Sequence, residues 1–392
     1  MANIPISEKR DVEKVLALAR RGMGRRSIAK ETGLSQWKVR RVLEERPCEN
    51  KKSATDRLRQ QIDLAEYKKL KKRKTFFELV GEELLRAVKT IPPKAPPRDT
   101  LRFRRKFEPE ELGLMISDSH IGLNVDQRES GGLGSYNVEI FLERLAFLKV
   151  SLKQIFEIHL GNTPYPAINL FFLGDIVDGA AIYPGHARQV DMHAMDQVVE
   201  AINGVGELIS WLAGLYPWSV NCHCVVGNHG RIGKKGEESP LNNFDFLTYV
   251  LLERELAGHD NVRFNISRSW WMIVERMGFR FYCAHGDDVR SWMGVPYYGL
   301  ERFLARVQQM VNDFDADFDY ILAGHFHRPA NIGKILLNGA WPGGTEYSIK
   351  QLQSAVAPVQ KLFSIHPTFG VTWERNIQLQ DPAKRAQIKI FK

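Results

Sequence analysis

Short apolar runs alternate with longer amphipathic stretches from position 112 onward. Runs of this kind between polar turns are typical of buried strands, and they lie at 112–116, 168–173, 220–226, 279–284 and 320–323. The stretches between them predict helices at 138–159, 195–215, 242–256 and 298–314. Further strands that complete a sheet are expected at 335–338, 362–365 and 370–376. The repeated order of strand, polar loop and helix predicts an α/β fold with a substantially parallel sheet.

The first fifty residues have helical spacing of their apolar positions instead. Helices are expected at 12–21, 27–32 and 36–45, with Asp11 and Ser35 placed to cap the first and the third. A small all-α domain is therefore predicted at 1–50. Its core is expected to contain Ile28, Ala29, Leu34, Val39, Val42 and Leu43.

A charged, helix-prone segment with a basic run at 68–74 follows this domain. It ends in the proline-rich stretch 91–97, which cannot continue a helix and predicts a stiff spacer. The sequence thus divides into a small helical domain at 1–50, a basic helical and proline-rich linker at 51–98, and a large domain at 99–392.

Charge is distributed unevenly over these parts. Residues 1–106 hold 30 Lys and Arg against 14 Asp and Glu, whereas the remainder holds 25 against 32. A basic front beside a mildly acidic body indicates a polyanionic partner, with DNA the first candidate. A solvated basic helical surface that only aids solubility is the alternative.

The rest of the composition is that of a globular protein from a reducing interior. The chain has four cysteines, too few and too unevenly placed for a disulfide framework. No apolar run long enough to span a bilayer is evident, and the N-terminus lacks the apolar stretch of a signal peptide. A soluble, cytoplasmic protein with no membrane partner is therefore expected.

Each of the five main predicted strands leads into a cluster of polar residues. The clusters are Asp118-Ser-His120, Gly174-Asp175-Ile-Val-Asp178-Gly179, Gly227-Asn228-His229, His285-Gly286-Asp287 and Gly324-His325-Phe-His327. A mixture of carboxylates and imidazoles suits Mn, Fe or Zn, and the D-x-H and H-x-H spacings let both side chains face one ion. Since polar residues at the carboxyl ends of strands form sites in such folds, the sequence predicts a metal centre there.

The order D-x-H, G-D-x-x-D, G-N-H, H and G-H-x-H resembles the calcineurin-like metallophosphoesterase family over about residues 110–345. The resemblance implies a sandwich of two mixed sheets flanked by helices, in place of the single parallel sheet. It also implies a hydrolase of phosphate esters that uses two divalent metal ions to activate water, with Mn²⁺ first and Fe, Zn or Mg as alternatives.

The same resemblance implies a role for each matching residue. The first metal would be held by Asp118, His120 and His327, and Asp175 would bridge the two metals. The second would be held by Asn228, His285 and His325. His229 would protonate the leaving oxygen or clamp the phosphoryl oxygens.

One position departs from the family pattern. Gly230 follows the Asn-His pair, where family members usually carry an acidic residue that orients the histidine. Asp178 is predicted to orient His229 instead. The protein-phosphatase branch, with its G-D-x-V-D-R-G run, fits less well than the DNA-repair exonuclease branch, because Ala180 follows Gly179 here.

Residues 26–45 resemble the helix-turn-helix of resolvases and transposases. Ala29 permits close helix approach, Gly33 allows the turn, and Leu34 and Val39 fill the angle between the helices. The resemblance implies major-groove contacts from Ser35, Gln36, Lys38 and Arg40, and phosphate contacts from Arg41. A basic helical hairpin that binds a protein is the alternative.

Three functions are compatible with these features. The leading one is a DNA phosphodiesterase, a nuclease targeted by its helix-turn-helix, of a kind that would suit a phage or mobile element. The second is a phosphatase or cyclic-nucleotide phosphodiesterase that acts on a small ester and carries a localising domain. The third is a catalytically inactive DNA-binding regulator, against which the complete ligand set argues.

Overall fold

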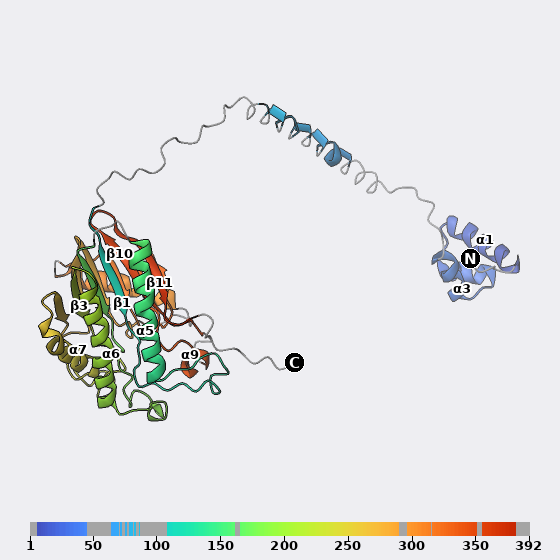
Figure 1. Ribbon diagram of the computed structural model, residues 1–392. Coiled ribbons are helices and arrows are strands. Elements are labelled where there is room, and N and C mark those ends of the chain that lie inside the picture. The colour runs from blue at the N-terminus through green and yellow to red at the C-terminus, as the bar shows by residue number, and fades with distance from the viewer. Residues whose placement is uncertain are drawn as a thin grey trace. The chain divides into compact units, whose positions relative to one another are not determined.

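The computed structural model (Figure 1) describes residues 6–44, 108–160, 165–289, 296–314, 316–350 and 355–381, together with helical positions scattered through 64–86. The predicted proline-rich spacer at 91–97 lies outside the described residues. The chain forms two compact units, Met1–Phe103 and Arg104–Lys392, and each is described by itself.

Residues 6–44 of the first unit form three helices: α1 (Ile6–Arg20), α2 (Arg25–Thr32) and α3 (Gln36–Glu44). Val15, Ile28 and Val39 are fully buried at their centre, as the apolar spacing predicts. Ser35 Oγ accepts a hydrogen bond from the Lys38 N–H at 3.3 Å, which confirms the predicted cap of α3. The predicted cap at Asp11 is wrong, because α1 begins five residues earlier and Asp11 lies within it.

The first sheet of the second unit has the order β11-β10-β1-β2-β3-β4. Its strands are β1 (Glu111–Ile116), β2 (Ala167–Phe172), β3 (Ser219–Cys224), β4 (Val262–Ile266), β10 (Val359–His366) and β11 (Gly370–Gln378). Neighbours from β1 to β4 are parallel, whereas β10 pairs antiparallel with both β1 and β11. The carboxyl ends of β1, β2 and β3 therefore share one edge of the sheet.

Helices cover the outer face of this sheet. They are α5 (Val138–Gln154), which continues as a π-helix over Ile155–His159, α6 (Ala194–Leu215) and α7 (Phe244–Glu255), followed by a 3₁₀ turn at Leu256–Gly258. Figure 1 shows α5 and α6 in front of the sheet, and one large apolar cluster fills the space between these helices and the sheet.

Helix α6 has the length and apolar composition of a membrane-crossing helix, although the sequence reading expected no such run. Half of its most apolar stretch is buried. Val198, Val205 and Leu212 of its buried face belong to the apolar cluster between these helices and the first sheet. Burial of one face against a sheet is the behaviour of a core helix in a globular domain.

The second sheet has the order β5-β6-β7-β9-β8. Its strands are β5 (Trp271–Arg276), β6 (Phe279–Ala284), β7 (Tyr320–Ala323), β8 (Ala330–Ile332) and β9 (Ile335–Leu337). β6, β7 and β9 are parallel, and the two edge strands are antiparallel. Helix α8 (Pro296–Asn312) covers the outer face, and two short helices, His186–Arg188 and α9 (Glu346–Lys350), lie in loops.

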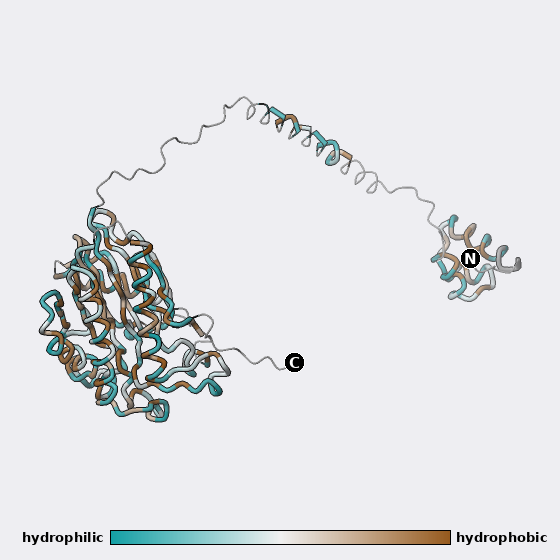
Figure 2. The backbone as a smooth tube through the Cα atoms, in the orientation of Figure 1, coloured by the Kyte–Doolittle hydropathy of each residue, from teal (hydrophilic) through white to brown (hydrophobic). Residues whose placement is uncertain are grey.

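The two sheets pack face to face, so the layers run helix, sheet, sheet, helix. Phe171 and Phe363 from the first sheet and Phe281 from the second meet between them, with ring centroids 5.8–6.0 Å apart. Figure 2 shows the hydrophobic positions following the strands. The two-sheet sandwich is confirmed, and the single parallel sheet inferred from the pattern alone is corrected.

Three edge strands, β4, β5 and β8, have no counterpart among the predicted elements. The side chains of β4 alternate in burial along Val-Arg-Phe-Asn-Ile, and β5 is only partly buried. A search for apolar runs favours strands that are buried on both faces, and it misses these three because their side chains are only partly buried or the strand is short.

The contact between Gly113 and Phe363 gives a stability prediction. A Cβ on Gly113 would lie 2.3 Å from the Phe363 ring, so Gly113→Ala should overpack the layer between the sheets and destabilise the fold by about 1–3 kcal/mol. Gly258→Ala is the matched control, since a Cβ there meets nothing within 4 Å. Urea denaturation of both variants measures the difference, and equal midpoints would contradict the packing assignment.

Candidate metal centre

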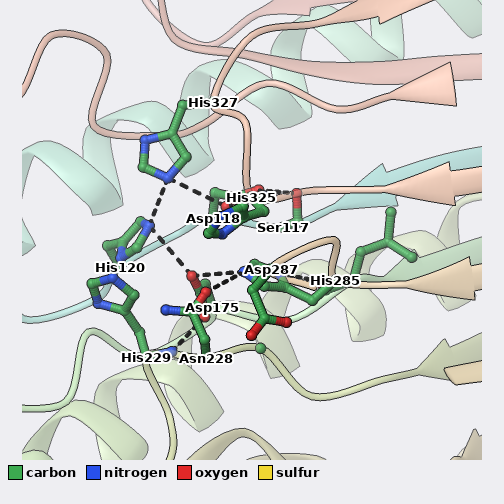
Figure 3. A network of polar contacts seen from close by, with 12 residues as sticks. Ser117, Asp118, His120, Asp175, Asn228, His229, His285, Asp287, His325 and His327 are labelled. Carbon is green, nitrogen blue, oxygen red and sulfur yellow. Dashed lines mark hydrogen bonds and ion pairs between the residues drawn. The ribbon is translucent and has the colours of Figure 1, made fainter. Parts of the chain in front are cut away.

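All seven predicted metal ligands lie together where five loops leave the two sheets. Asp118 and His120 follow β1, Asp175 follows β2 and Asn228 follows β3. From the second sheet, His285 follows β6, and His325 and His327 follow β7. Figure 3 shows these side chains pointing toward one another from separate loops.

Asp118, His120 and His327 form the first group, with ligand atoms within 4.8 Å of one another. His327 Nε2 lies 3.3 Å from Asp118 Oδ1 and 3.1 Å from His120 Nε2. Two neutral imidazole nitrogens that face each other at this distance repel unless a proton or a cation lies between them. The group therefore has the geometry of a cation site.

Asp175, His285 and His325 form the second group. His285 Nε2 is 3.0 Å from Asp175 Oδ2 and 3.0 Å from Asn228 Oδ1, so the amide joins the same group. Asp175 Oδ2 is also 4.0 Å from His120 Nε2 in the first group. One carboxylate thus faces both groups, as a bridging ligand must.

Hydrogen bonds at the far side of the rings fix which nitrogen faces the site. His120 Nδ1 donates to Asp178 Oδ1 at 2.8 Å, and His285 Nδ1 donates to the Leu173 carbonyl at 2.7 Å. Both Nε2 atoms are therefore left with lone pairs directed inward, which is the usual arrangement of metal-binding histidines.

Backbone strain is concentrated at the same residues. Among the described residues, six non-glycine positions have positive φ, and five of them are predicted ligands: Asp118 (53°), His120 (45°), Asp175 (53°), His325 (67°) and His327 (54°). The left-handed conformation costs a residue with a Cβ about 1–3 kcal/mol and persists where the surrounding fold imposes it. The loops are therefore held in a shape that aims these side chains inward.

The donor set of two carboxylates, four imidazoles and one amide fits two borderline divalent ions such as Mn, Fe or Zn. The choice of ion is not fixed by these donors. A comparison with protein families matches residues 114–348 to the calcineurin-like phosphoesterases. The chain belongs to the calcineurin-like phosphoesterase family. It is accordingly assigned to the hydrolases of phosphoester bonds that depend on a dinuclear metal centre.

Solved structures with a similar fold have low sequence identity to this phosphoesterase. Vacuolar protein sorting 29 from Cryptosporidium parvum is 14% identical, with 66% of this chain and 87% of that chain covered and a TM-score of 0.29. Vps29 from Entamoeba histolytica, solved with Zn²⁺, is 13% identical, with 69% and 99% covered and a TM-score of 0.29. A predicted phosphoesterase from Streptococcus pneumoniae is 10% identical, with 69% and 99% covered and a TM-score of 0.24. No curated protein matches the chain.

Asp178 contacts three histidines of the phosphoesterase site. Besides His120, it accepts from His186 Nε2 at 2.8 Å and lies 3.0 Å from His229 Nδ1. Burial alone would raise the pKa of Asp178, but the hydrogen bonds from the three histidines hold it well below its usual range. This is the contact expected of a carboxylate that orients His229. Sequence reasoning gave His186 no role.

His229 is placed to carry a proton. Burial lowers its pKa, but the carboxylates of Asp175 and Asp178 outweigh burial and raise it to about 9. Because Nδ1 is engaged by Asp178, through its side chain and its carbonyl oxygen at 3.1 Å, Nε2 is the nitrogen left for a substrate oxygen.

The departure at Gly230 has a steric reason in this chain. A Cβ at this position would lie 2.2 Å from Asn243 Oδ1. That oxygen accepts from the Asp245 N–H at 2.8 Å and caps α7, while Asn243 Nδ2 donates to the Gly227 carbonyl at 2.9 Å. An acidic side chain at 230 would displace this bridge.

Asp245 is a residue that sequence reasoning missed. It is fully buried at the start of α7, and its Oδ2 accepts from the N–H groups of Asp175 and Gly227, both at 2.9 Å. Its Oδ1 accepts from Ile176 at 3.0 Å and from Val177 at 3.3 Å. One carboxylate thus holds the loop of the bridging residue and the loop that leads to Asn228.

The predicted DNA contacts belong to the first unit and are exposed. Gln36, Lys38, Arg40 and Arg41 lie on α3, and Ser35 precedes it. Arg40 pairs with Glu44 at 2.6 Å, and the Arg41 guanidinium lies 5.4 Å from the ring centroid of Trp37.

Asp245→Asn should weaken metal binding while leaving every proposed ligand in place. The amide would present an N–H₂ group to backbone N–H donors, so the loops of Asp175 and Gly227 would lose a shared anchor. Loss of such a supporting contact typically lowers metal affinity about 10–100-fold. Calorimetric titration with Mn²⁺ measures it, with Asp313→Asn, an exposed residue of the α8 terminus, as the control. Unchanged affinity would refute the anchoring role.

Proposed function

We propose that this phosphoesterase is a DNA phosphodiesterase. The observation that carries the proposal is that a second pocket adjoins the one at the metal centre. A pocket of about 240 Å³ is lined by several proposed ligands, and a pocket of about 180 Å³ shares Asn228 with it. A phosphomonoester has one ester group to accommodate, whereas a diester has two, so room in a second pocket beside the centre favours a diester.

Each pocket also has an exposed aromatic side chain. Tyr183 lines the larger pocket and is stacked on His186 with ring centroids 4.4 Å apart, and Trp270 lines the smaller one. Nucleobases stack on such rings with little sequence preference. This feature supports a nucleic-acid diester over a small alkyl ester.

The proposed chemistry divides between the metal ions and His229. When bound, two divalent ions would supply a nucleophile from water and neutralise the phosphoryl oxygens. Asp118, His120, His327, Asp175, Asn228, His285 and His325 would hold them. His229 lines the larger pocket, and Asp178 keeps its Nε2 directed away from the loop, so it can give a proton to the leaving oxygen.

The first unit supports DNA as the polymer. Gly33 ends α2 in the left-handed conformation (φ 69°), which produces the turn before α3. Gln36, Lys38 and Arg40 on α3 are exposed and polar, and the excess of basic residues in 1–106 adds a non-specific attraction to phosphates. We infer that this unit brings the phosphoesterase to DNA.

His229→Ala should lower Mn²⁺-dependent cleavage of DNA about 10²–10⁴-fold, because the leaving alkoxide loses its proton donor. The loss should be smaller with a p-nitrophenyl diester, since nitrophenolate leaves without a proton. DNA affinity in EDTA should not change. Linear, nicked and single-stranded DNA are the substrates, and His366→Ala, beyond the opposite end of the first sheet, is the control.

Wild-type protein that leaves all three DNA forms intact and hydrolyses the small diester rapidly would refute DNA as the substrate. That result would favour a small-ester phosphodiesterase whose first unit only localises it.

Substitution of Lys38 and Arg40 by Gln should weaken binding of duplex DNA in EDTA about tenfold, in the range expected when base-edge contacts are lost. If either side chain contacts a phosphate, the slope of the logarithm of the affinity against the logarithm of the salt concentration should also become shallower by about 0.9 per contact. Fluorescence anisotropy over a range of salt concentrations measures both. The charge-matched control replaces the exposed residues Arg10 and Lys14 of α1. Equal losses in the two double variants would contradict a recognition role for α3.

A further inference from the structure

The smaller pocket beside the metal centre lies between the loop that follows His229 and the start of β5. Arg231, Lys234 and Lys235 come from that loop, and Trp270 precedes β5. Asn228, a proposed metal ligand, lines the same pocket. A group bound against Trp270 and these cations would therefore be adjacent to the phosphate under attack.

The two pockets differ in the charge of their linings. The smaller one has three carboxylates, Glu238, Asp287 and Asp288, beside its three cations. Asp126, Glu129 and Glu346 line the larger pocket, and the described part of the chain places no Lys or Arg in its lining. Asp126 and Glu346 are paired with Arg128 and Lys350, so what the larger pocket lacks for a second phosphate is a cation in its lining. The smaller pocket supplies cations and is therefore the better path for the rest of a strand.

Two cationic groups of the smaller pocket have unused hydrogen-bonding capacity. The Lys234 ammonium is exposed and has no acceptor among the residues that the structure describes. Arg231 donates through Nη2 to the Ile182 carbonyl at 3.3 Å, but its buried Nε has no partner in the described structure. Lys235, in contrast, is held by Asp287 at 2.7 Å and Asp288 at 3.5 Å.

Trp270 supplies a flat apolar surface beside these cations. Its side chain is 45% exposed although it is large and hydrophobic, and none of the described aromatic rings stacks on it. Grooves that bind single-stranded nucleic acid combine such rings with cations: the base stacks on the ring and the phosphate contacts the cation, a role for which the Lys234 ammonium is available.

We propose that the smaller pocket is a nucleotide subsite, in which Trp270 stacks the base next to the scissile phosphate and Lys234 and Arg231 bind the following phosphate. The proposal rests on the proposed DNA phosphodiesterase function and names its substrate as a single strand at the site of cleavage. Trp270 and Lys234 are positioning residues in this scheme.

The test compares two substrates in the full-length, Mn²⁺-loaded protein. One is a single-stranded oligonucleotide, and the other is methyl p-nitrophenyl phosphate, which has neither a base nor a second phosphate. Trp270→Ala should lower kcat/KM for the oligonucleotide about 5–150-fold, the range for loss of one stacked base. The small diester has no base to stack, so its kcat/KM should change by less than about twofold.

Lys234→Gln should mainly raise KM for the oligonucleotide. The slope of log KM against log salt concentration should become shallower by about 0.7, as expected for loss of one single-strand phosphate contact. The matched controls are Phe369→Ala, an exposed aromatic in the turn between β10 and β11, and Lys334→Gln, an exposed lysine in the turn between β8 and β9. Both turns lie at the sheet ends opposite the metal centre, so neither substrate should be affected.

Three outcomes are decisive. A selective loss with the oligonucleotide in both pocket variants supports the subsite. If the wild type cleaves DNA but the pocket variants lose no activity, or lose it equally on the two substrates, the subsite is overturned. The DNA phosphodiesterase function then still stands. Failure of the wild type to cleave any nucleic acid overturns both.

Discussion

Asp175 lies between two groups of imidazoles, with its Oδ2 3.0 Å from His285 Nε2 and 4.0 Å from His120 Nε2. A buried carboxylate in this position is tolerated only if its charge is matched and its backbone is fixed. Its Oδ1 accepts from the His229 N–H at 2.7 Å, and its own N–H donates to Asp245 at 2.9 Å. The Asp245 carboxylate that holds Asp175 also accepts from the Gly227 N–H, so it ties the loops of β2 and β3 to the start of α7.

The site could be predicted from the sequence because its signal is local. Asp118, Asp175 and Asn228 each follow a mostly apolar strand, and parallel strands bring their carboxyl ends to one edge. The resemblance then supplied the second sheet, which carries His285 and His325. Spacing alone does not reveal that two sheets rather than one present these loops, since each short strand has the same apolar pattern in either arrangement.

The supporting contacts could not be predicted, because they join residues that are distant in sequence. Asp245 accepts from the N–H of Asp175, which is 70 residues away in the sequence. In the sequence it is only an acidic residue in the first turn of a helix, where such a charge is commonly favourable. His186 occupies a loop without a regular pattern and reaches Asp178 only through the fold. The Cβ clash that reserves position 230 for glycine likewise exists only once Asn243 is in place.

Discrimination among phosphate esters must arise outside the metal ligands. The strained backbone at Asp118 and Asp175 is imposed by sheets packed on both sides, so the centre has one shape whichever ester arrives. A rigid centre of this kind stabilises charge that develops on any phosphoryl group. The linings are what differ: the larger pocket has carboxylates such as Glu346 and no described Lys or Arg, whereas the smaller one has cations, among them Lys234, beside its carboxylates. Under the proposed function, substrate choice would follow from this difference between the two pockets.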